Sequence, residues 1–177
     1  MSRQTWEESI ANATQDGTPV ADTTTETSIF PALTVPANYL QDGRTFRIFA
    51  FGKLSTTGTP TIIFAIRLGG EAGTLLATTE AITNGSGVAN VNWSVDAILQ
   101  VRANGSSGSV LVMGEAKVHT AAGTVVVNVF GVSGFDAPAA VTVNLTQDLT
   151  LVLTADWSAA SASNTLTGMI FGVESMN

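Results

Sequence analysis

The residues best suited to chemistry in this sequence are Glu115, Lys117 and His119, which alternate along one predicted strand. Side chains two residues apart lie on the same face of a strand, so the three would form a row that could transfer protons. The solvent-facing side of an amphipathic strand normally carries such charges too. With a single histidine among many hydroxyls, no Ser-His-Asp order can be assigned. We therefore predict no catalytic residues and no enzymatic activity.

Other reactive arrangements are missing or isolated in the sequence. The acids are scattered singly, and the spacing of Asp148 and Asp156 does not favour a catalytic carboxylate pair over turn residues. The glycines of residues 68–74 (LGGEAGT) lack the Gly-Lys-Ser/Thr ending of a phosphate loop. Clustered aspartates at calcium-loop spacing do not occur, and cysteine is absent. The sequence therefore predicts no cofactor and no bound metal.

Length and charge limit the partners that this chain can have. A chain of 177 residues can bury a core without cross-links. Its net charge of −7 would be repelled by phosphate backbones, so we expect no direct binding to nucleic acid. The first residues lack the apolar run of a secretory signal, and no stretch reaches the roughly 20 apolar residues of a membrane span. We expect synthesis in a cytoplasm and no membrane partner.

The elements that must position these side chains are a series of short strands. Residues 43–70 carry β-branched and aromatic residues on both sides of a turn at Gly58 and Pro60, which predicts a hairpin of two long strands. In its second strand Ile62, Phe64, Ile66 and Leu68 share one face, which we assign to the core. Residues 89–103 alternate cleanly, with Trp93 on the apolar side.

This pattern continues to the end of the chain and sets the fold class. Turn signals recur about every 8 to 12 residues, which is typical of a two-sheet sandwich or a barrel. We predict an all-β, jelly-roll-like two-sheet sandwich, because the strands are long and no Cys-Trp-Cys pattern of an immunoglobulin domain occurs. A lipocalin-type barrel is the second possibility. Residues 1–24 are expected to form an N-terminal arm and residues 25–177 a single β-sandwich domain.

The predicted arm contains one possible turn of helix from Trp6 to Ala11, followed by turn formers and threonines. Trp6 and Ile10 are four residues apart, so both would lie on one helix face and could anchor the arm on a neighbouring subunit. The alternative is a frayed terminus. If the arm is such an anchor, deletion of residues 1–20 would leave a folded domain but weaken its attachment.

Apolar side chains also occur on strand faces that should meet water. These residues are Phe49, Phe51, Ile63, Leu111 and Met113. A sandwich has one interior, so loops of the same chain or another subunit must cover them. We predict a subunit interface, with trimerisation through Phe49, Phe51 and Ile63, because a three-fold axis brings like residues together.

Several short motifs carry a resemblance to a known family. They are PANY at residues 36–39, GRT at 43–45, TGTP at 57–60 and RLGG at 67–70, with Trp93, Arg102 and Gly108 in the second half. Over about residues 34–120 the chain resembles a recurrent module in virion proteins of tailed bacteriophages. The resemblance implies a jelly-roll-like sandwich, commonly trimeric, on the outside of the virion, without catalytic residues.

The resemblance leads to two functional hypotheses. The first is a homotrimeric capsid decoration (cement) protein that binds the major capsid protein on the outer surface of a phage head, because the chain is short and lacks a repetitive fibre shaft. The second is a tail- or fibre-associated module that binds a receptor or carbohydrate. An exposed row of aromatic side chains with amides would favour the second hypothesis.

Overall fold

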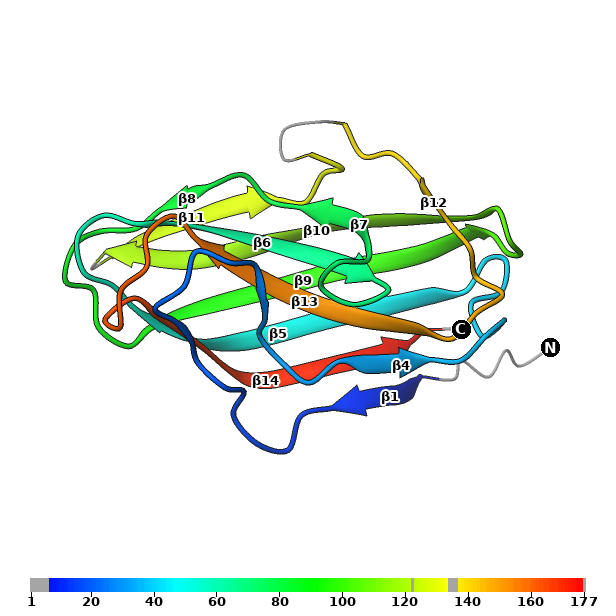
Figure 1. The fold of residues 1–177 in the computed structure, drawn as a ribbon, viewed down its shortest axis with the longest axis horizontal. Coiled ribbons are helices and arrows are strands. Elements are labelled where there is room, and N and C mark those ends of the chain that lie inside the picture. Colours follow the sequence, from blue (N-terminus) through cyan, green and yellow to red (C-terminus); the bar gives the residue numbers. More distant parts are fainter. Residues whose placement is uncertain (1–6, 122, 134–136, 177) are drawn as a thin grey trace.

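The structure, a computed structural model, describes residues 7–121, 123–133 and 137–176, and its regular elements there are all β-strands (Figure 1). The first seven strands are β1 (Glu8–Asn12), β2 (Val20–Ala21), β3 (Thr27–Ser28), β4 (Leu33–Val35), β5 (Thr45–Ser55), β6 (Thr61–Leu68) and β7 (Thr74–Thr78). The other seven are β8 (Ile82–Thr83), β9 (Val91–Ala103), β10 (Gly108–Ala121), β11 (Thr124–Val129), β12 (Val141–Val143), β13 (Leu149–Trp157) and β14 (Thr165–Ser175). Within the described residues no helix could span a membrane.

The strands form two antiparallel sheets that pack face to face. The larger sheet has the order β1-β14-β5-β9-β10-β11, with β2 beside β14 and β12 beside β10. The smaller sheet has the order β3-β13-β6-β7, with β4 on β13 and β8 on β6. The orders β1-β14-β5-β9 and β3-β13-β6-β7 are those of a jelly roll, and the β10–β11 hairpin extends one edge. The predicted all-β, two-sheet sandwich is confirmed.

The predicted hairpin over residues 43–70 is wrong, because β5 and β6 lie in different sheets. β5 pairs with β14 and β9, whereas β6 pairs with β13, β7 and β8. The connection between them crosses from one sheet to the other, and its hydrogen bonds go to distant loops. Thr56 Oγ1 donates to the Gly85 carbonyl, and the Thr57 amide donates to Asn164 Oδ1. The turn residues are compatible with either connection, and these distant partners select the crossover.

The core lies between the sheets and contains the side chains that alternation assigned to it. Ile62, Phe64, Ile66 and Leu68 are all buried, as predicted. Trp93 is also buried, with its ring centroid 5.4 Å from that of Phe64 in the opposite sheet. Two apolar layers, one from each sheet, therefore interdigitate along the length of the sandwich.

The N-terminal segment is a strand where a turn of helix was predicted. β1 pairs with β14 from Glu8 opposite Ser175 to Asn12 opposite Gly172, so the helical prediction is wrong over residues 8–11. Trp6 lies outside the described residues. A single helical turn is unstable alone, whereas the edge of β14 offers a full set of backbone partners.

β2 joins the predicted arm to the sandwich a second time. It pairs with β14, Val20 is buried, and Trp157 Nε1 donates to the Val20 carbonyl at 3.1 Å. Residues 8–21 therefore contribute two strands to the larger sheet, the buried side chain of Val20, and the partly buried side chains of Ile10, Ala11 and Ala13 that pack against the core.

Deletion of residues 1–20 should lower the free energy of unfolding, in contrast to the expectation from sequence. The deletion removes the pairing of β1 with β14 and the burial of Val20, and burying one such side chain is worth about 1.5–3 kcal/mol. Urea unfolding followed by far-ultraviolet dichroism measures the loss. Deletion of residues 1–6 is the matched control, because it leaves both strands in place. An unchanged urea midpoint in the longer deletion would show that β1 and β2 contribute no stability.

Candidate functional site

The outer face of the larger sheet carries a concentration of exposed apolar side chains. We call the following residues the outer apolar patch: Phe51, Met113, Val125, Val127, Val129, Met169 and Ile170. They belong to β5, β10, β11 and β14. Among the described residues, the one other large apolar side chain with comparable exposure is Met176, just after β14. The exposed apolar surface is thus gathered on one side of the sandwich.

Strand register aligns the patch in rows across the sheet. In one row Ile170 pairs with Phe51, Phe51 with Ser94, Ser94 with Lys117, and Lys117 with Val127. Residues paired directly across neighbouring strands point to the same side of a sheet. The row is therefore apolar at both ends and polar in the middle.

A β-bulge exposes two adjacent residues of β14. The register of β14 against β5 shifts between Gly168 and Ile170, so Met169 is an extra residue. Met169 is 42% exposed and Ile170 is 54% exposed. Strict alternation would have turned one of them inward, which is why the sequence alone did not identify this part of the patch.

A groove of about 660 Å³ crosses the polar middle of this face. Its walls are Phe51, Met169, Ile170 and Val125, and its polar lining is Asp16, Asn92, Ser94, Lys117 and His119. Lys117 and His119, which the sequence singled out, thus line the groove, while Glu115 forms an ion pair with Lys117. Both side chains of that pair are a little under half exposed, so solvent screens the pair and it contributes little stability. The groove offers hydrogen-bonding groups for binding.

The aromatic side chains of β5 are held in place by their neighbours. Arg47 donates two hydrogen bonds to the Asp96 carboxylate, at 3.0 and 2.7 Å, which hold the pKa of Asp96 below its usual value. The Arg47 guanidinium lies 5.4 Å from the centre of the Phe49 ring, and the Phe49 and Phe51 rings are 6.3 Å apart. Phe49 also lies over Gly172, where a side chain would collide with the ring. These contacts restrict the aromatic pair to one arrangement on the sheet surface.

The structure groups four of the five predicted interface residues. Phe49, Phe51, Leu111 and Met113 lie on the outer face of the larger sheet, whereas Ile63 belongs to β6 in the smaller sheet. The crossover between β5 and β6 separates them, so Ile63 cannot contribute to the same continuous surface. Trimerisation itself stays a prediction.

The sequence analysis also missed three valines of the patch. Val125, Val127 and Val129 occupy alternate positions of β11 and pair with His119, Lys117 and Glu115. Their odd-numbered spacing was visible in the sequence. A run of consecutive valines concealed it, because Val126 breaks the apolar-polar alternation.

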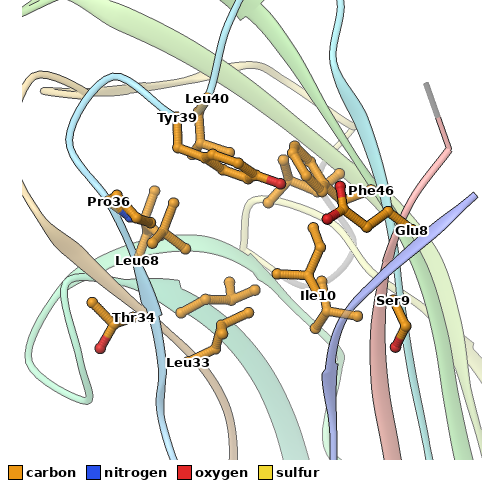
Figure 2. Close-up of a pocket in the computed structure, with 14 residues that line it drawn as sticks. Glu8, Ser9, Ile10, Leu33, Thr34, Pro36, Tyr39, Leu40, Phe46 and Leu68 are labelled. Atoms are coloured by element: carbon orange, nitrogen blue, oxygen red, sulfur yellow. The ribbon is translucent and has the colours of Figure 1, made fainter.

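A second concavity opens between the two sheets near the start of β1 (Figure 2). Its volume is about 260 Å³, and its lining is mostly apolar, with Glu8 and Tyr39 among the few polar contributors. Ile10, one of the two predicted arm anchors, points into this cavity. The predicted role of Ile10 as an anchor on another subunit is not tested by this position.

The outer face of the smaller sheet carries an acidic pair with opposite pKa shifts. Burial raises the pKa of Glu26. Hydrogen bonds from Arg67 and Thr154, together with the charge of Arg67, lower this pKa by more than burial raises it, so the net shift is downward. Asp156 Oδ1 has no hydrogen-bond partner among the described residues. Burial, and to a smaller extent the charge of Glu26, raise the pKa of Asp156. Asp156 is therefore a poorly solvated carboxylate on the face opposite the outer apolar patch.

We also searched the described residues for groups of metal-binding side chains and compared the chain with known proteins. Within residues 7–121, 123–133 and 137–176 no three His, Cys, Asp or Glu side chains are grouped to hold a metal ion. The chain matches no protein-family model and no curated protein. Among solved structures, the chain is similar to the CBM2 module of the evolved Dit of Lactobacillus casei BL23 phage J-1, over 99% of both chains with 10% identity and a TM-score of 0.38. At this score the likeness identifies neither a family nor a function.

Replacement Asp156→Asn should stabilise the protein slightly at neutral pH and leave it unchanged in acid. Because the folded-state pKa is raised, stability is lost as the pH rises from the unfolded-state value through the folded one. Asparagine cannot ionise and avoids this loss. Urea unfolding of both proteins across pH 3 to 8 measures the difference. Asp16→Asn, which makes the same charge change at an exposed position, is the control, and an equal gain there would contradict the argument.

Proposed function

We propose that this chain is a non-enzymatic structural protein of a tailed-phage virion and that the outer apolar patch is its attachment surface for other protein subunits. The observation that carries the proposal is the gathering of exposed apolar side chains on one sheet face. Contiguous exposed apolar patches on a folded protein generally mark contact surfaces. The virion location rests on the sequence resemblance over residues 34–120.

The edge of the larger sheet supports the same proposal. β11 ends the strand order, and its sequence TVVVNV has no charged residue and no proline. Natural edge strands normally carry such residues, because an unprotected row of backbone donors and acceptors pairs with other chains. An edge that lacks this protection and adjoins an apolar face suits a surface that is covered in an assembly.

The arrangement that we favour is a homotrimer on the outer surface of the phage head, bound to the major capsid protein. A protein that binds only the assembled shell stabilises it by mass action. In a trimer each patch residue is repeated around one axis, so a contact made by one subunit is made three times.

A second function, carbohydrate or receptor binding at a tail or fibre, is favoured by the groove. Its Phe51 ring could stack on the apolar face of a sugar, while Asn92, Lys117 and His119 could bind hydroxyls. Against this alternative, few aromatic side chains are exposed among the described residues. Trp93 and Trp157 are 2% and 1% exposed and cannot contribute a stacking platform.

Two substitutions on the same face separate these functions. Val127 belongs to the patch but does not line the groove, whereas Asn92 lines the groove and is polar. If the patch holds other subunits, Val127→Asp should weaken self-association or attachment to particles by tenfold or more, since a central contact is typically worth about 2 kcal/mol. Asn92→Ala should leave both unchanged. Sedimentation velocity and occupancy on particles depleted of the protein measure the effects.

The opposite pattern would support the carbohydrate-binding alternative. In that case Asn92→Ala weakens binding to host cell-wall polysaccharide, and Val127→Asp does not. Phe51→Asp, which alters both surfaces, should reduce either activity. A wild-type protein that stays monomeric at micromolar concentration and binds neither particles nor polysaccharide would contradict both functions. Labelling of intact virions adds the location, because decoration predicts many copies over the head and adhesion predicts a few at the tail tip.

A further inference from the structure

The second concavity, which opens near the start of β1 (Figure 2), is an apolar cavity lined by residues of both sheets. Ile10, Phe46 and Leu99 reach it from the larger sheet. Leu33 and Leu151 reach it from the smaller sheet. β1 and the loop after β4 also contribute to its lining, and apolar side chains here face an unfilled volume.

The volume suits a small organic molecule. About 260 Å³ is well above the roughly 150 Å³ of an apolar cavity that binds benzene. Water in such a space finds few hydrogen-bond partners, because the lining is dominated by aliphatic and aromatic side chains. An apolar body somewhat larger than one aromatic ring would replace that water without loss of hydrogen bonds.

The mouth of the cavity carries a negatively charged group and a hydroxyl group. The Glu8 carboxylate and the Tyr39 hydroxyl both lie at one side of it (Figure 2), and no Lys, Arg or His of the part of the chain that the structure describes lines it. Arg44 is near, but its guanidinium stacks on the Tyr39 ring at 4.3 Å and donates to the Tyr39 carbonyl. Among the described residues, the charged group that lines the cavity is therefore an anion.

The surroundings of Glu8 add to this negative potential. Glu7 and Glu174 are close enough to act on Arg47, and Arg47 itself is already paired with Asp96. The Arg47 guanidinium is therefore already engaged by a carboxylate of the protein. A ligand carboxylate would meet like charge, whereas an ammonium group would meet two hydrogen-bond acceptors, Glu8 and Tyr39.

We propose that this cavity is a binding site for a small primary amine with an apolar body, such as an arylalkylamine, whose ammonium group pairs with Glu8 while the body fills the space beneath Ile10 and Leu33. β1, which closes the site, is an edge strand with a bulge between Ser9 and Ala11. Edge strands open at low cost, so the ligand has a route of entry. The site is separate from the outer apolar patch and is independent of the function proposed above.

Titration of the full-length protein with 2-phenylethylamine, 2-phenylethanol and 3-phenylpropanoate tests the proposal. Methyl resonances of Leu33 and Leu151 should shift on binding, and affinity should fall from amine to alcohol to carboxylate. Glu8→Gln should reduce the preference for the amine over the alcohol by tenfold or more and leave alcohol binding unchanged. This readout distinguishes a pairing role of Glu8 from a structural one.

Cavity-filling variants complete the test. Leu33→Trp should abolish binding of all three compounds, and Ile10→Trp, at a half-buried position, is the second variant should the first fail to fold. Thr124→Trp, at an exposed position of β11 outside the outer apolar patch, is the control and should bind as the wild type does. The proposal is overturned if the cavity methyls do not respond up to the solubility limit, if the carboxylate binds as tightly as the amine, or if the filled variants still bind.

Discussion

The contact between Phe64 and Trp93 joins the two sheets, and the arrangement of the remaining elements depends on it. Phe64 projects from the smaller sheet and Trp93 from the larger one. The Trp93 indole N–H lies 3.2 Å from both the Lys53 and the Thr167 carbonyls, so the ring is tied to β5 and β14 as well as to its own strand. Gly52 leaves space for it, because a side chain there would collide with the indole and with β14. The Trp93 ring is thereby packed in the core while its N–H group is hydrogen-bonded. These contacts hold β9, β5 and β14 in register.

Because the core is complete within one chain, the two outer faces are free to differ. On the smaller sheet Glu26, Arg67 and Thr154 form a connected polar network, and the carboxylate of Glu26 covers a strand position that would otherwise face water. On the larger sheet Phe51 and Ile170 remain about half exposed. A difference of this kind is not required for folding. The exposed apolar side chains of the larger sheet are therefore not explained by the core of the sandwich, and this is why we propose that face as the attachment surface.

The candidate site was partly readable in the sequence. Alternation put Phe49, Phe51 and Met113 outside the core because each strand has one core-facing side, and the structure gathers them on one face. The bulge that exposes Met169 could not be predicted, since it depends on register against β5. The position of Asp16 beside the groove could not be predicted either, because the strands on either side of a loop determine where its residues lie.

The sequence by itself determined that the chain is all-β and which side of each long strand is buried, because the two-residue period of side chains along a strand is a local property. Only the tertiary structure decided which strands pair. The backbone partners of a strand can lie far away in the chain, as Glu8 lies opposite Ser175. For the same reason β5 and β6 belong to different sheets although their sequences suit a hairpin, and residues 8–12 extend along β14 although their spacing suits a helix. Local pattern fixes the face of a strand, and long-range hydrogen bonding fixes its neighbours.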